Sequence, residues 1–128
     1  FKVKGSVRDV GHVGLFSNTS LMSSFGGKPF YEIYMGGWSN SKTGIRKVGA
    51  SGTVLVTQNT PGIISTEFKK FWVSWEDRII ALGYGSSVGE DLILSLNDSV
   101  APMSVNYVGF TSYSWGGNDW NHTWKFNK

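Results

Sequence analysis

The sequence contains no cysteine, which excludes disulfide bonds and thiolate metal sites. It contains only two histidines and three prolines among its 128 residues. No run of Lys or Arg exceeds two residues, and 12 basic against 9 acidic side chains give a net charge of +3. Nucleic acids and anionic membranes are therefore not expected as partners. No apolar stretch is long enough to span a bilayer, so membrane insertion is not expected either.

The motifs of common enzyme classes are also missing. Neither His12 nor His122 is accompanied by a serine in a Gly-X-Ser-X-Gly motif. Gly83-Tyr84-Gly85 is the nearest approach to a glycine-rich nucleotide-binding turn, but no helical pattern follows it. The aspartates stand where turns favour Asp, and no spacing resembles a calcium loop. We therefore expect a protein that is not an enzyme, with no catalytic residue, no metal ion and no cofactor.

Glycine and aromatic residues, by contrast, are abundant. Seventeen glycines and 15% aromatic residues, together with many Val, Ile, Ser and Thr, favour an all-β protein. A chain of 128 residues can form one domain with a hydrophobic core but is too short for two. No internal repeat, low-complexity segment or linker is present. Residues 1–128 are therefore predicted to form a single domain.

Alternation of apolar and polar residues indicates about ten short strands and no amphipathic helix. This pattern predicts a single-domain antiparallel β-sandwich. Residues 2–7 are predicted to be an edge strand. Residues 91–96 are also compatible with a short helix, although the flanking turns favour a strand. The predicted strands are 2–7, 10–16, 31–35, 42–48, 53–57, 68–75, 78–82, 91–96, 104–111 and 123–126.

The segment 31–46 has the pattern of a strand, a tight polar turn and a second strand. Gly36-Gly37 allows the bend, the turn carries Trp38 and Asn40, and Arg46 lies on the return strand. An aromatic ring beside amide and hydroxyl groups on a rigid hairpin is typical of a binding site. The alternative is that Trp38 caps the core while its polar neighbours only form the turn.

A second aromatic and polar segment occupies residues 112–120. Trp115 and Trp120 flank a Gly-Gly pair that is followed by Asn118 and Asp119. Sugars require an aromatic surface for the apolar side of a pyranose and polar groups for its hydroxyls, held on preformed loops. This segment is the stronger sugar-binding candidate, because two exposed tryptophans are costly without a use. The alternative is that both tryptophans fold back onto the rim of the sandwich.

Two further tryptophans, Trp72 and Trp75, lie on opposite faces of one predicted strand. Their mid-strand positions favour the core for both. Since they cannot both point inward, one must face outward or into a subunit contact. A homo-oligomer would also make weak sugar sites multivalent.

Four segments of the chain together resemble the farnesoic acid O-methyltransferase-like domain family of animal proteins. They occur in the order of that family, across nearly the whole chain. The first segment is Glu-Ile-Tyr-Met-Gly-Gly-Trp-Ser-Asn-Ser-Lys-Thr-Gly-Ile-Arg at 32–46. The other three are residues 71–75, 79–85 and 105–110. Domains that are similar to this one occur in extracellular proteins, and some small marine-invertebrate lectins resemble it. The resemblance implies a secreted lectin for galactose or N-acetyllactosamine glycans.

Secretion has some support in the sequence itself. Asn18, Asn97 and Asn121 each begin an Asn-X-Ser/Thr sequon, although such sequons also arise by chance. The chain begins with Phe1, which is typical of a mature form after removal of a signal peptide or of a trimmed chain.

Three hypotheses follow from these observations. The first is a secreted lectin that binds glycans of cell surfaces or glycoproteins, through Trp38, Asn40, Arg46, Trp115, Asn118, Asp119 and Trp120. The second is a non-catalytic module for protein interaction or oligomerisation. The third is the S-adenosylmethionine-dependent methyltransferase that the family name suggests, and the missing nucleotide motif argues against it.

Overall fold

A computed structural model describes residues 1–6, 9–19, 29–49, 55–114 and 122–126. Ten strands and one short helical turn occupy these residues. The elements are β1 (Lys2–Lys4), β2 (Asp9–Phe16), β3 (Phe30–Gly36), α1 (Gly37–Asn40), β4 (Lys42–Val48), β5 (Leu55–Asn59), β6 (Lys69–Glu76), β7 (Ile79–Tyr84), β8 (Leu92–Asn97), β9 (Tyr107–Ser114) and β10 (Thr123–Lys125).

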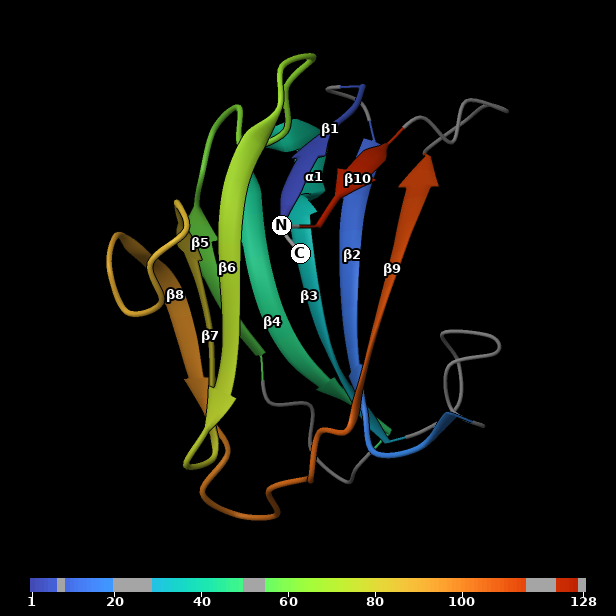
Figure 1. The fold of residues 1–128 in the computed structure, drawn as a ribbon. Coiled ribbons are helices and arrows are strands. Elements are labelled where there is room, and N and C mark those ends of the chain that lie inside the picture. Colours follow the sequence, from blue (N-terminus) through green and yellow to red (C-terminus); the bar gives the residue numbers. More distant parts are fainter. Residues whose placement is uncertain (7–8, 20–28, 50–54, 115–121, 127–128) are drawn as a thin grey trace.

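The strands form two antiparallel sheets of five strands each. The order is β10-β1-β6-β7-β8 in the first sheet, called sheet I, and β5-β4-β3-β2-β9 in the second, called sheet II. Figure 1 shows the two sheets facing each other, with the edge strands β8 and β5 on one side and β10 and β9 on the other. The prediction of an all-β antiparallel sandwich of about ten short strands is confirmed.

Strand pairing decides two local questions that the sequence pattern left unsettled. β1 lies between β10 and β6, so the prediction of an edge strand at the N-terminus is wrong. Its partner β10 comes from the far end of the chain, which a local pattern does not reveal. Residues 92–97 pair with β7 and are therefore a strand rather than a helix. No helix in the described part of the chain is long and apolar enough to cross a membrane.

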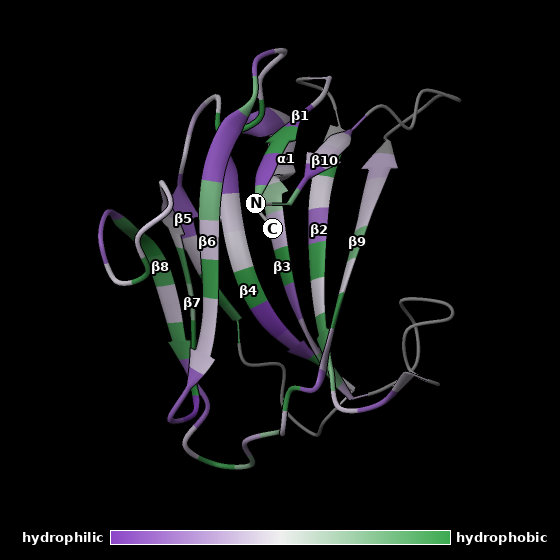
Figure 2. Cartoon of the chain, in the orientation of Figure 1, coloured by the Kyte–Doolittle hydropathy of each residue, from purple (hydrophilic) through white to green (hydrophobic). Residues whose placement is uncertain are grey.

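The core consists of the side chains that alternate inward from both sheets. Figure 2 shows the corresponding alternation of hydrophobic and hydrophilic bands along the strands. In β3, for example, Tyr31, Ile33 and Met35 are fully buried between the sheets. Burial of this apolar surface is the main favourable term that holds the sheets together. The largest fully buried side chains are Phe16, Phe30, Tyr31, Phe71, Leu15, Ile33, Met35, Ile45, Ile63, Ile64, Leu82 and Leu96.

One ion pair is buried in this interior. Lys47 and Asp98 are 4% and 2% exposed, and Lys47 Nζ lies 2.6 Å from Asp98 Oδ2. The Tyr31 hydroxyl donates to the same oxygen at 2.7 Å, and Ala101 N–H donates to Oδ1 at 3.2 Å. The sequence suggested a turn role for Asp98, whereas the structure shows a carboxylate that joins β3, β4 and the segment after β8.

Candidate functional site

The turn between β3 and β4 holds a tryptophan in the solvent. Trp38 is 54% exposed, although it follows seven consecutive buried residues of β3. Trp38, Ser39 and Asn40 all have positive φ angles of 49°, 57° and 60°. Left-handed conformations cost non-glycine residues about 1–3 kcal/mol each and are concentrated at functional sites. Three such residues in succession make this turn a candidate for a functional site.

Asn40, which the sequence proposes as a sugar contact, is turned inward. Its amide nitrogen donates to the Ile64 carbonyl at 2.7 Å, and its amide oxygen accepts from Ile64 N–H at 3.1 Å. Its own carbonyl accepts from Gly62 N–H at 2.8 Å. Asn40 therefore anchors the strained turn to the segment after β5, and its role in a site would be to position Trp38.

Beside the turn, a charged network lies on the outer face of sheet II. The register pairs Glu32 with Arg46 on β4 and with Gly14 on β2, which places their outward positions in one row. His12 lies opposite Tyr34 in the adjacent row. Glu32 Oε1 lies 2.7 Å from His12 Nδ1, and Oε2 accepts a hydrogen bond from Arg46 Nε. The three side chains thus form a chain of hydrogen bonds across three neighbouring strands.

The carboxylate at the centre of this network is kept ionised. Burial alone would raise the pKa of Glu32, which is 5% exposed, but the hydrogen bonds from His12 and Arg46 outweigh it and lower the pKa. Because an ionised carboxylate can only accept, His12 must carry a proton on Nδ1. The network therefore fixes the orientation of both basic side chains on the surface.

An aromatic platform adjoins this network. The rings of Tyr34 and Trp38 are 5.5 Å apart, Lys42 Nζ lies 5.5 Å from the Trp38 ring centroid, and the Arg46 guanidinium lies 6.0 Å from the Tyr34 centroid. Burial raises the pKa of Tyr34, so its hydroxyl is neutral at physiological pH. Contacts of this kind between cations and ring faces are favourable. The name "platform site" is used below for Trp38, Tyr34, Arg46, Glu32 and His12.

A glycine on β4 makes room for the platform. A Cβ on Gly44 would lie 2.1 Å from the Tyr34 hydroxyl oxygen, so the ring lies directly over this glycine. We expect Gly44→Ala to displace the ring and to lower the free energy of unfolding by about 1–3 kcal/mol. In a Tyr34→Ala background the same change is expected to be neutral or stabilising, by up to about 1 kcal/mol, because alanine suits a strand better than glycine. Urea unfolding of the four proteins measures the coupling, and equal effects in both backgrounds would contradict the predicted contact.

The structure brings together part of the site that the sequence predicts. Trp38 and Arg46 belong to the platform site, whereas Tyr34, Glu32 and His12 were not proposed from the sequence. Alternation along β3 does place Glu32 and Tyr34 on one face, but the proximity of His12 depends on the pairing of β2 with β3. Trp115, Asn118, Asp119 and Trp120 lie outside the described residues. β9 is described as far as Ser114, whose strand ends at the same end of sheet II as α1 (Figure 1).

Comparison with known proteins gives one match. The sequence model of the farnesoic acid O-methyl transferase family matches residues 1–127. The chain belongs to this family. The match confirms the resemblance that the four segments indicated. No curated protein and no solved structure matches the chain.

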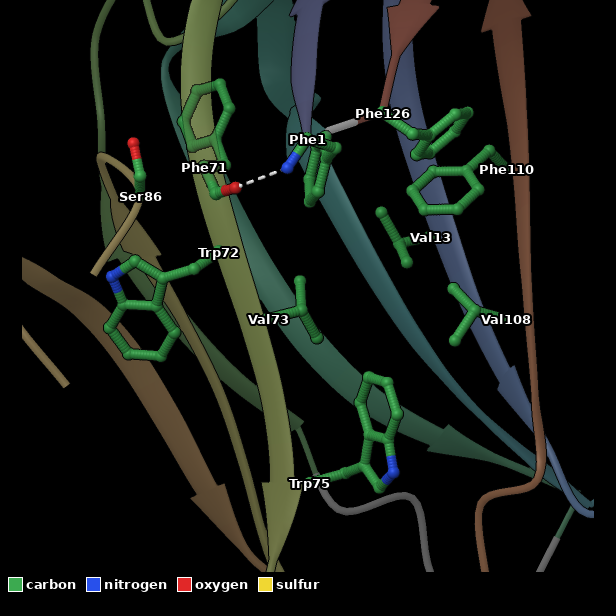
Figure 3. Close-up of a pocket in the computed structure, with 10 residues that line it drawn as sticks. All are labelled: Phe1, Val13, Phe71, Trp72, Val73, Trp75, Ser86, Val108, Phe110 and Phe126. Atoms are coloured by element: carbon green, nitrogen blue, oxygen red, sulfur yellow. Dashed lines mark hydrogen bonds between the residues drawn. The ribbon is translucent and has the colours of Figure 1, made fainter. Parts of the chain in front are cut away.

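The name of the family raises the question of where a methyl donor and an acceptor could bind. A cavity of about 320 Å³ opens between β6 and β9. Figure 3 shows the side chains that line it. Trp75 and Val73 point into it from sheet I, facing Val108 on sheet II. Ser86 provides the one hydroxyl of the described lining, and no carboxylate belongs to it. The lining residues are Phe1, Val13, Phe71, Trp72, Val73, Trp75, Ser86, Val108, Phe110 and Phe126.

A pocket for S-adenosylmethionine usually offers an acidic side chain for the ribose and a glycine-rich turn before a helix. The described lining of the cavity offers neither feature. Gly83-Tyr84-Gly85, the nearest sequence match, ends the strand β7 and leads into a turn, not a helix. Among the described residues there is also no group of three or more His, Asp or Glu side chains that could hold a metal ion.

Proposed function

We propose that this protein is a lectin and that its platform site binds the glycan. The observation that carries the proposal is the exposed Trp38 indole, held by a strained turn beside a network of charged side chains. A pyranose could place its apolar side on the indole, as sugar-binding sites commonly require. The hydroxyls would then face the polar groups on the neighbouring strands.

Arg46 is the residue best suited to bind those hydroxyls. Its guanidinium has five N–H donors, and the Nε–H is used in the hydrogen bond to Glu32. Its side chain is 44% exposed, so the outer part of the fork is accessible to a ligand. Glu32 then acts as a positioning residue, which keeps the guanidinium preorganised and reduces the entropy lost on binding.

The remaining features of the proposal follow from the sequence and the family. We propose galactose or N-acetyllactosamine glycans of cell surfaces and glycoproteins as ligands, a homo-oligomer that makes the sites multivalent, and no enzymatic activity. We also propose a secreted protein. The Asn18 and Asn97 sequons support secretion because both side chains are exposed, as glycosylation requires.

Trp38→Ala is expected to weaken glycan binding at least about tenfold, because aromatic residues at the centre of an interface contribute most of the binding energy. The indole is exposed, so the variant should remain folded. A glycan array identifies the ligand, and titration of that glycan by calorimetry measures the loss. The matched control is Trp75→Ala, which removes a second exposed tryptophan at the cavity between the sheets.

Each variant separates the lectin proposal from an alternative. Loss of binding in Trp75→Ala but not in Trp38→Ala would move the ligand to the cavity and contradict the platform site. Loss only in Trp120→Ala would keep the lectin and move its site to the 112–120 segment. No binding of the folded protein to any glycan would overturn the lectin proposal, and binding of S-adenosylmethionine would favour the methyltransferase.

The cavity favours a second candidate function, a module for protein interaction or oligomerisation. Trp75 is 40% exposed and Phe126 is 57% exposed at this apolar opening. Apolar side chains gathered at an opening of this kind are common in protein contacts. Sedimentation of the native protein and of Trp75→Ala tests this function, because a smaller species in the variant would place a subunit contact at the cavity.

A further inference from the structure

Lysine side chains from three different strands meet on the outer face of sheet I. The register places Lys2 of β1 opposite Lys125 of β10 and opposite Lys70 of β6. Directly opposed residues of antiparallel strands have Cα atoms about 4.5–5.5 Å apart, so the three lysines form a continuous row. Lys4 follows on the same face of β1, because Val3 between them is buried in the core. The name "lysine cluster" is used below for Lys2, Lys4, Lys70 and Lys125.

An aromatic ring holds two of these side chains in place. Lys4 Nζ lies 4.9 Å from the centroid of the Phe68 ring, and Lys125 Nζ lies 4.4 Å from it. Attraction between an ammonium group and a ring face restrains both long side chains. The cluster is therefore partly preorganised, which reduces the entropy that a bound ligand would have to offset.

The cluster has no carboxylate partner among the described residues. The ion pairs of the described chain join His12 and Arg46 to Glu32, and Lys47 to Asp98. Like charges directly opposite each other in a sheet are destabilising. The chain nevertheless gathers four lysines here although its net charge is only +3. An anionic ligand with several charges would relieve this repulsion.

We propose that the lysine cluster binds a sulfated polysaccharide. The row of ammonium groups crosses the strands, which suits a linear chain with regularly repeated sulfate groups. Lysine acts as a point charge with three rotatable donors, whereas planar bidentate recognition of phosphate favours arginine. Membrane-surface segments add apolar side chains that enter the lipid, but Val3, which alternates with Lys2 and Lys4, is in the core. Proteins that bind single-stranded nucleic acid stack bases on aromatic rings, and the Phe68 ring is already covered by ammonium groups.

Lys70→Glu is the decisive variant, and heparin is the probe. The change removes one cation and adds an anion opposite Lys2, so heparin affinity should fall about tenfold or more. The slope of the logarithm of the binding constant against the logarithm of the salt concentration should become shallower by about one unit. The loss of one phosphate contact to a nucleic acid has the same effect. The new glutamate faces a lysine, so thermal stability should be maintained or increased. A loss of binding in this variant would therefore not reflect unfolding.

Arg78→Glu is the matched control. Arg78 is exposed in the turn between β6 and β7, at the opposite end of the strand that carries Lys70. This substitution changes the net charge by the same amount as Lys70→Glu without altering the lysine cluster. Selective loss in Lys70→Glu supports the proposal. Equal losses in both variants would show a dependence on net charge alone and would overturn it.

Further measurements distinguish sulfated polysaccharides from other polyanions, and the lysine cluster from the platform site. Failure of the native protein to bind heparin at physiological salt would overturn the proposal. So would tighter binding to a single-stranded oligonucleotide or to phosphatidylserine vesicles than to heparin. Trp38→Ala should retain native heparin affinity, because the platform site lies on the other sheet. The heparin result therefore tests the lysine cluster independently, even if the platform site binds no glycan.

Discussion

Replacement of Asp98 by alanine is expected to lower the free energy of unfolding by about 3–5 kcal/mol. Its carboxylate accepts hydrogen bonds from Lys47 Nζ and from the Tyr31 hydroxyl in the interior. Without the carboxylate, the ammonium group of Lys47 stays buried and keeps, among the described contacts, a hydrogen bond to the Ala101 carbonyl. An uncompensated buried charge is strongly destabilising. Urea unfolding followed by tryptophan fluorescence measures the loss.

A double variant tests whether the unpaired charge is the cause. Lys47→Met with Asp98→Leu removes both charges and fills the space with apolar groups, a change that is often neutral in buried ion pairs. We expect it to recover most of the stability lost in Asp98→Ala. A double variant as unstable as the single one would show that the loss comes from packing and from the Tyr31 hydrogen bond.

The same carboxylate should make the stability of the protein fall at low pH. Burial raises the pKa of Asp98, but the hydrogen bonds from Lys47 and Tyr31 outweigh it and hold the pKa below its ordinary value of 3.8. Because the folded pKa is lowered, the contribution of Asp98 is fully present above the unfolded pKa and is lost as the pH falls through the folded pKa. Unfolding free energies measured from pH 7 downward should therefore fall less steeply in Asp98→Ala than in the native protein.

Trp72→Ala is expected to lower the free energy of unfolding by about 3–5 kcal/mol. Trp75→Ala on the same strand should lower it by less than about 1 kcal/mol. Trp72 is 5% exposed and lies over Gly83, where a Cβ would be 2.3 Å from the indole. Its Nε1 also donates to the Glu90 carbonyl at 2.7 Å. Trp75 points into the open cavity and keeps much of its surface in solvent.

Thermal unfolding of the two variants measures this difference, and Trp72→Phe provides the control. Phenylalanine retains most of the contact over Gly83 but lacks the donor to Glu90, so its cost should be intermediate. Equal costs for the two alanine variants would contradict the assignment of Trp72 to a covered surface and of Trp75 to an open one.

The positions of the strands along the chain could be predicted from the sequence because alternation is a local property, whereas the order of the strands within each sheet was not predicted. All ten predicted strands overlap strands of the structure. The β3–β4 hairpin followed from Gly36-Gly37 between two alternating segments. The predicted edge strand at the N-terminus was wrong because its partners lie about 65 and 120 residues away along the chain.

The candidate site was predicted only in part, because a local pattern reveals only residues that are close in the sequence. Trp38 and Arg46 belong to one hairpin, so a local pattern could place them together. His12 reaches Glu32 only through the pairing of β2 with β3, and the lysine cluster depends on three strands from distant parts of the chain. Asn40 was proposed as a ligand contact because its amide follows Trp38 in a polar turn of the hairpin. Its burial depends on the position of Ile64, which the local sequence does not reveal.

The sequence by itself determined the class of fold, the strands and the family, because these depend on composition, alternation and local motifs. Only the tertiary structure decided which side chains are covered. A period of two residues assigns each side chain of a strand to one of two faces, but it does not say what lies over either face. That is why Trp72 is covered and Trp75 is open although the pattern favoured the core for both. It is also why Asp98 is an interior ion and not a turn residue, and why four lysines from three separate strands share one surface.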